Sequence, residues 1–256
     1  MNEIYLKLRD RARQIVDSLP IPVFRQELVL ALSESEFLLA SDPLLKSLAG
    51  QMSADLDNDF GHGILHATLV CIDAGAIVHT EMQDKISGKT PGATIREQMV
   101  LAQAAGLLHD IRRKQANHAE KGAAYAADLL ERQALKQSNI ETICRAIREH
   151  EAFVPADPDQ GAKPRSLISD ALYDADKFRW GTDNFTHTLW DMVMFARIPL
   201  QDFIQKYPGG MHKLSQIRDT FRTNTGKKYG PEMIDLGIET GNRLFDFLKT
   251  EYPSFF

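Results

Sequence analysis

Four apolar stretches of this 256-residue chain carry histidine or aspartate where a helical periodicity predicts burial. They are DFGHGILHATLV with His62 and His66, LAQAAGLLHDIRRK with His109 and Asp110, IREHE with His150, and LYDADKFRW with Asp174 and Asp176. A buried charge is costly unless it is paired or binds a metal. The pattern therefore predicts a helical fold with a metal site in its interior.

Apolar residues recur at helical spacing along most of the chain, and we find no clear alternating strand pattern. We expect helices over 4–19, 24–40, 62–82, 96–110, 118–135, 140–151, 167–180, 188–198 and 231–252, and a further helix that begins at Pro43. The small residues of 102–106 would let neighbouring helices approach closely. The segment TNTGKKYGP, residues 223–231, lacks the spacing of a P-loop and is interpreted as a turn. These features predict an all-α fold in one domain, 1–256.

The composition is that of an ordinary globular protein, with 43% hydrophobic and 25% charged residues. The formal net charge of −5 lacks the excess of basic residues that non-specific nucleic-acid binding requires, so we expect no nucleic-acid partner. Cys71 and Cys144 lie in apolar helical patterns, which indicates buried, reduced thiols. The charged start MNEIYLKLRDRARQIV does not resemble a signal peptide, and no apolar run approaches the ~20 residues of a membrane span. We therefore expect a cytoplasmic protein without a membrane partner.

Neutral imidazole and carboxylate together suit a catalytic divalent metal with open coordination positions. Adjacent helix residues point about 100° apart, so His109 and Asp110 would straddle an ion. In a two-metal site the carboxylate of Asp110 can bridge while the imidazole binds one ion. Each residue taken singly also has a structural explanation, as a hydrogen-bonded core histidine or an aspartate at a helix end. This ligand chemistry accepts Mn, Fe, Co, Ni, Zn or Mg, as one ion or two.

The ordered set resembles the HD-domain superfamily of metal-dependent phosphohydrolases over about residues 58–185. The resemblance rests on His66 in HATLV, on His109 and Asp110 in LLHDI, and on Asp176 in LYDADKF. It implies that these four residues bind metal.

The resemblance also implies a fold, an HD-domain helical bundle with extra N- and C-terminal helices packed on it. The extra helices would come from residues 1–57 and 186–256. Their apolar side chains would pack on the core, or would form a lid or the surface of a homodimer. These side chains include Phe37, Leu38, Phe195, Phe245 and Phe247.

Two further matches concern a second ion. HAEKGAAYA and AIREHE resemble family stretches that supply histidines, which makes His118 and His150 candidates. In members with two metals, histidines at these places help to bind the second ion, which gives six ligands with Asp110 bridging. In one-metal members such histidines contact the substrate phosphate instead.

Other polar residues near these motifs have two interpretations each. Gly63 stands where family members commonly have Asp, and His62 before it either caps the helix or contacts phosphate and relays a proton. Lys177 either binds phosphate or pairs with Asp174. Arg112 and Arg113 hold an anion or complement the helix C-terminus. Three histidines match no part of the pattern and are interpreted as structural: His79, His187 and His212.

The implied activity is hydrolysis of a phosphomonoester or phosphodiester, on a nucleotide or another small phosphate ester, by metal-activated water. His62, His118, His150 and Lys177 are the catalytic candidates that would stabilise charge on the phosphoryl oxygens. Two alternatives remain open from the sequence, an HD-fold di-iron oxygenase and a non-catalytic, nucleotide-binding regulatory module.

Overall fold

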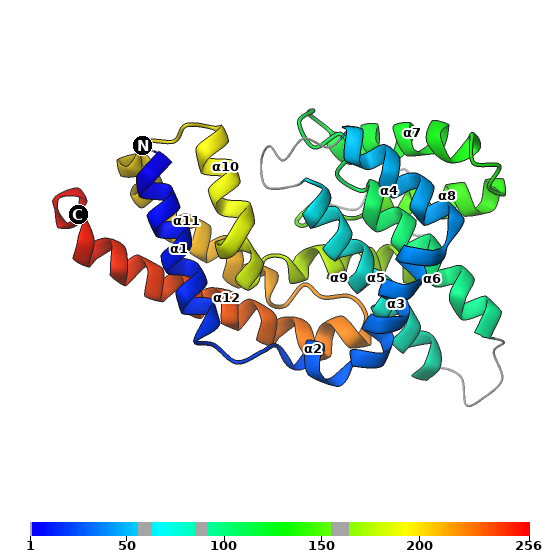
Figure 1. Cartoon of the computed structure of the whole chain (residues 1–256), viewed down its shortest axis with the longest axis horizontal. Coiled ribbons are helices and arrows are strands. Elements are labelled where there is room, and N and C mark those ends of the chain that lie inside the picture. The colour runs from blue at the N-terminus through cyan, green and yellow to red at the C-terminus, as the bar shows by residue number, and fades with distance from the viewer. Residues whose placement is uncertain (1, 56–62, 85–91, 155–163) are drawn as a thin grey trace.

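The computed structural model describes residues 2–55, 63–84, 92–154 and 164–256, and every regular element within these ranges is helical (Figure 1). The α-helices are α1 (Asn2–Asp17), α2 (Val23–Glu27), α3 (Val29–Ser41), α4 (Pro43–Asp55), α5 (Ile64–Asp84), α6 (Gly92–Leu108), α7 (His118–Glu131), α8 (Gln137–Arg148), α9 (Leu167–Phe178), α10 (Leu189–Phe195), α11 (Leu200–Ile217) and α12 (Asn224–Glu251). A π-helical turn, η3 (Asn184–Thr188), and a 3-10 turn, η4 (Pro253–Phe255), complete the set. The predicted all-α fold is confirmed.

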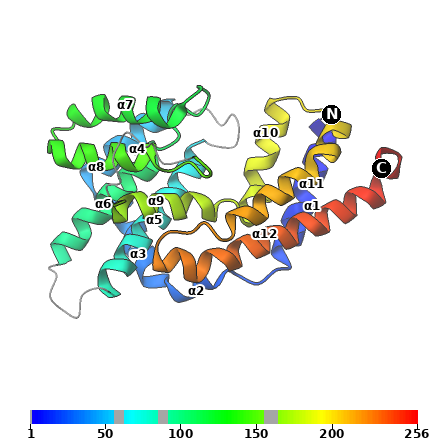
Figure 2. The same ribbon diagram turned by 180° about the vertical axis from the view of Figure 1, so that it is seen from behind.

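The helices form two groups that lie side by side in Figure 1 and are seen from behind in Figure 2. One group contains α3 to α8, and the other contains α1, α10, α11 and the C-terminal half of α12. Helix α9 lies between them, since it packs on α5, α6 and α8 on one side and on α12 on the other. Residues on α9 can therefore face both groups.

Helix α6 packs closely along α5, and a glycine makes this possible. A Cβ atom on Gly106 would lie 2.7 Å from the Cα atom and 2.9 Å from the backbone nitrogen of Cys71. Both atoms belong to the α5 backbone and cannot rotate away. The small residues of 102–106 therefore do what the sequence predicts, and the Cys71 thiol is buried and free.

We expect Gly106→Ala to lower the free energy of unfolding by about 1–3 kcal/mol, because overpacking against backbone outweighs the gain in helix propensity. Gly50→Ala is the matched control, since Gly50 is also helical and a Cβ atom there meets nothing within 4 Å. That control should be as stable as the wild type or slightly more stable. Urea unfolding of both variants measures the difference, and equal midpoints would contradict the close approach of α5 and α6.

Several helices differ from the sequence prediction. The helix expected over 24–40 is divided at Leu28 into α2 and α3. The helix expected over 96–110 ends at Leu108, which leaves His109 and Asp110 just beyond it. Helix α11 was not predicted; it contains Pro208 and two glycines.

The interpretation of residues 223–231 as a turn is wrong, because these residues form the start of α12. Thr223 caps this helix by accepting a hydrogen bond from Gly226 N at 2.8 Å. Buried carboxylates on other helices bind the same backbone: Asp174 accepts from Thr223 N at 2.8 Å, and Glu81 accepts from Thr225 N at 2.7 Å. These tertiary hydrogen bonds outweigh the weak helix propensity of the segment.

Within the described residues, one segment of α5, Ile64–Gln83, is long and apolar enough to cross a membrane. Such a length was not expected from the sequence. However, 61% of its most apolar window is buried inside the fold. Packing in the core accounts for its composition.

The apolar side chains of the terminal helices have mixed environments. Leu38 is buried, and the Phe245 ring stacks on Tyr207 with centroids 4.9 Å apart. Phe37 and Phe195 are 61% and 47% exposed, so these two do not pack on the core, and a lid or homodimer surface stays the prediction for them. Each lies on the solvent side of its helix.

Candidate metal centre

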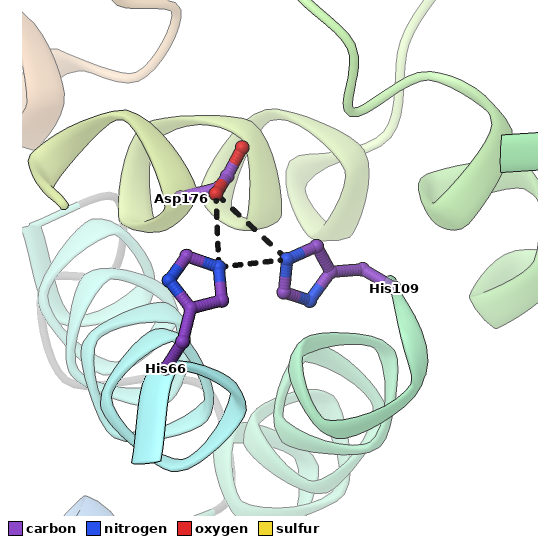
Figure 3. A group of neighbouring side chains, drawn as sticks. All are labelled: His66, His109 and Asp176. Atoms are coloured by element: carbon purple, nitrogen blue, oxygen red, sulfur yellow. Dashed lines mark hydrogen bonds and ion pairs between the residues drawn. The ribbon is translucent and has the colours of Figure 1, made fainter. Parts of the chain in front are cut away.

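Three helices bring one group of potential metal ligands together (Figure 3). His66 lies in the first turn of α5, His109 directly follows α6, and Asp176 lies on α9. The Nε2 atoms of His66 and His109 are 3.2 Å apart, and Asp176 Oδ1 lies 3.4 Å from the first and 3.8 Å from the second. All three residues are buried.

A second group of buried residues adjoins the first and contains Asp110, His118 and His150. Asp110 Oδ1 lies 3.4 Å from His118 Nε2 and 3.5 Å from His150 Nε2. The other carboxylate oxygen, Oδ2, lies 3.4 Å from His109 Nε2 in the first group. Asp110 thus faces both groups, one oxygen to each, and the six residues form one cluster.

The ends of two helices fix the orientation of two imidazoles in this cluster. His109 Nδ1 lies 2.7 Å from the carbonyl oxygen of Gly106, and His150 Nδ1 lies 2.6 Å from that of Ile147. These carbonyls belong to the last turns of α6 and α8, where backbone oxygens lack helical partners. A carbonyl only accepts, so each Nδ1 carries the proton and donates. In the neutral form of each ring, Nε2 then presents a lone pair to the cluster, which is the tautomer that binds metal.

The donor set fits a divalent cation. Imidazole lone pairs and carboxylate oxygens approach one another within 4.8 Å in each group, and all of them are acceptors. Such an arrangement is unfavourable in a buried site unless positive charge lies among the acceptors. Mixed nitrogen and oxygen ligands of this kind suit catalytic divalent metals.

The electrostatics of the first group favour the ligand forms of two members. Burial lowers the pKa of His66, which keeps its imidazole neutral. Burial alone would raise the pKa of Asp176, but the Lys177 ammonium and the neighbouring imidazoles hold it well below its usual value. Burial opposes a charged His109, yet the carboxylates of Asp110 and Asp176 raise its pKa above the usual value. A cation bound here would have to displace that proton, so metal affinity should fall with falling pH.

Two basic side chains contact the cluster. Lys177 is buried and forms an ion pair with Asp176, and its ammonium lies 5.0 Å from the Tyr173 ring centroid. Arg113 Nη1 donates to His118 Nε2 at 2.9 Å and lies 3.8 Å from Asp110 Oδ1. A guanidinium thus already supplies positive charge to the second group.

Several sequence-based interpretations of nearby residues need revision. Lys177 pairs with Asp176, whereas Asp174 accepts hydrogen bonds from the start of α12 and lies outside the cluster. Burial raises the pKa of Asp174 to about 6. Arg112 lies 3.8 Å from the Tyr125 ring centroid and contacts no residue of the cluster. His62 lies outside the described residues.

The remaining predicted structural histidines stay outside both ligand groups. Each instead lies within hydrogen-bond distance of a neighbouring side chain: His79 of Gln83, His187 of Thr186, and His212 of Gln216.

A cavity of about 810 Å³ lies beside the cluster. At one end it is lined by members of both ligand groups, among them His66, Asp110, His150 and Asp176. From there it extends past η3 to α10 and α11, so the two helix groups both contribute to its wall. A small molecule in this cavity would contact the cluster directly.

One buried ion-pair network supports the cluster and was missed by the sequence analysis. Asp73 on α5 accepts from Arg25 at 2.5 and 2.7 Å and also binds Arg179, which in turn pairs with Asp183. Asp73 is fully buried. The network ties the end of α9 to α5 and thereby holds Asp176 beside His66. The sequence feature that could have revealed this network is an aspartate, Asp73, inside the apolar run VCIDAGAIV.

One family model matches part of this helical unit. A family model described as the HD domain matches residues 74–180. The match includes His109, Asp110, His118, His150 and Asp176. It begins after His66, whose place in the cluster therefore rests on the geometry. No curated protein and no solved structure matches the chain.

Proposed function

Because residues 74–180 are an HD domain of the metal-dependent phosphohydrolase superfamily, we propose that this chain hydrolyses phosphomonoester or phosphodiester bonds of a small molecule. The observation that carries the proposal is the buried six-residue cluster at the end of a cavity. We propose that His66, His109 and Asp176 hold one divalent ion, and that His118 and His150 hold a second. Asp110 would bridge the two.

When bound, the divalent ions lower the pKa of water and neutralise charge on phosphoryl oxygens. The chain's own residues would position the ester. Lys177 and Arg113 supply positive charge beside the cluster, where phosphoryl oxygens gain negative charge in the transition state. Arg113 would exchange its hydrogen bond to His118 for one to phosphate. This scheme requires no serine or cysteine nucleophile.

Release of inorganic phosphate from a panel of nucleotides, cyclic dinucleotides and sugar phosphates tests the proposal. For the cyclic dinucleotides, formation of the linear product is followed as well. We expect turnover with at least one divalent metal, its loss on chelation and its return when metal is added back. The proposal fails if no ester is hydrolysed with any metal, or if His109→Ala is as active as the wild type.

The six-residue cluster also fits a di-iron oxygenase, so the assay should be repeated without oxygen. Hydrolysis under anaerobic conditions with Mn or Mg would exclude that alternative. Iron in the purified protein together with substrate-dependent oxygen uptake would favour it. Tight nucleotide binding without turnover would instead favour the regulatory module.

A further inference from the structure

The lining of the cavity beside the cluster is charged near the cluster and mainly apolar farther away. Near the cluster it is lined by four of the six ligand residues together with Lys177, Arg113 and Arg179. Farther away its wall is apolar and comes from η3, α10 and α11. The main apolar residues of that wall are Phe185, Leu189, Val193, Phe203, Tyr207 and Leu214.

Few polar side chains of the described residues face the apolar part. The Tyr207 hydroxyl donates to the carbonyl oxygen of Gly241 at 2.8 Å and is therefore engaged within the fold. Asn184 and Thr188 lie on η3, and Lys206, Lys213 and Gln216 are exposed on α11. A nucleobase in the apolar part would bury donors and acceptors with few partners, which is unfavourable. An apolar chain would need no partners there.

Helix α11 leaves one position of the cavity wall without a side chain. Lys206, Gly210 and Lys213 are spaced so that they share one side of α11, and all three line the cavity. A Cβ atom on Gly210 would meet nothing within 4 Å, so this part of the wall is open. Gly209 has equally free space but does not line the cavity.

We infer that the substrate is the phosphate ester of a long-chain apolar alcohol, with its phosphate at the six-residue cluster and its chain against α10 and α11. This inference rests on the proposed phosphohydrolase function. The volume of about 810 Å³ lies within the range of small-molecule sites and leaves room for a chain beyond the phosphate. Residues of the terminal helices would then determine specificity, while α5 to α9 and their ends supply the ligand cluster.

Two measurements with decyl phosphate and butyl phosphate test this inference. The first is equilibrium binding by calorimetry, and the second is kcat/KM for phosphate release in the metal-loaded protein, with AMP as a third substrate. Each buried methylene contributes about fourfold to affinity, so we expect decyl phosphate to exceed butyl phosphate by at least about tenfold in both measurements. It should also exceed AMP in kcat/KM.

The variant Gly210→Phe places a ring in the open part of the wall, and Gly209→Phe is the matched control. We expect Gly210→Phe to reduce the decyl-to-butyl ratio by about tenfold or more and Gly209→Phe to retain the wild-type ratio. Equal binding of decyl phosphate and butyl phosphate, or AMP as the best substrate, would overturn the inference. Neither result would contradict the proposed phosphohydrolase function. Tight, Gly210-sensitive binding of decyl phosphate without hydrolysis of any ester would support the apolar site and refute the proposed function.

Discussion

Replacing Asp110 with asparagine should lower kcat for phosphoester hydrolysis by about 1000-fold or more. One oxygen of this carboxylate faces His109 and the other faces His118 and His150. Asparagine has nearly the same shape but lacks the negative charge, and its amide nitrogen would face imidazole lone pairs only as a neutral donor. A bridging position would thereby be lost, and metal ions supply several kcal/mol of transition-state stabilisation.

The control for this substitution is Asp170→Asn, on the same helix as Asp176 but outside both ligand groups. Asp170 pairs with Arg165 at the surface. We expect this variant to keep the kcat of the wild type within about twofold, because exposed ion pairs contribute little. Circular dichroism would establish that both variants remain folded. An Asp110→Asn protein with wild-type kcat would contradict the bridging role.

Replacing Asp73 with asparagine should lower the free energy of unfolding by about 3–5 kcal/mol. Asp73 pairs with both guanidinium groups, those of Arg25 and Arg179. The Arg179 side chain is 4% exposed and that of Asp73 is fully buried. Solvent therefore cannot stabilise the arginine charge after the carboxylate is removed. Removing the shared partner of two buried ion pairs leaves the guanidinium charges only partly compensated, by Asp183 on the Arg179 side.

Asp183→Asn provides the comparison, because Asp183 pairs with the same Arg179 but its side chain is 33% exposed. We expect it to cost about 1 kcal/mol or less. Guanidinium chloride unfolding measures both variants, and a shift in midpoint at constant slope reports stability. Equal losses at the two positions would show that the network does not depend on burial of Asp73.

The apolar periodicity was enough to predict the helices that carry the cluster, and it marked His66, His109, Asp110, His150 and Asp176 as polar residues in apolar stretches. His118 was predicted only from the resemblance to the HD-domain family. The decisive pattern was His109 and Asp110 at the end of an apolar helix. Its physical reason is visible only in the structure, where the Gly106 carbonyl at the end of α6 orients the imidazole. The same arrangement recurs at His150 and the end of α8.

The sequence could not separate ligands from other buried carboxylates. Asp73, Glu81 and Asp174 interrupt apolar helices just as Asp176 does, yet they bind arginines or the start of α12. Only the packing of distant helices distinguishes these roles. For the same reason the start of α12 was mispredicted, since its stabilising hydrogen bonds come from residues far away in the chain.

The cavity was also beyond prediction. Its wall combines α9 with η3, α10 and α11, and α11 was not predicted as a helix. Phe203 and Gly210 have no reactive or charged group, so the sequence alone does not indicate that they line a binding site. Their significance depends on facing the same space as the cluster.

The number of divalent ions bound per chain tests the central claim most directly. Native mass spectrometry of protein loaded with Mn²⁺ and freed of excess metal should show two ions on the wild type and one on His118→Ala. Of the two ligand groups, His118 belongs only to the second, so its loss should leave the first group able to bind. A folded wild-type protein that binds no metal, or a His118→Ala variant with the wild-type number of ions, would contradict the account.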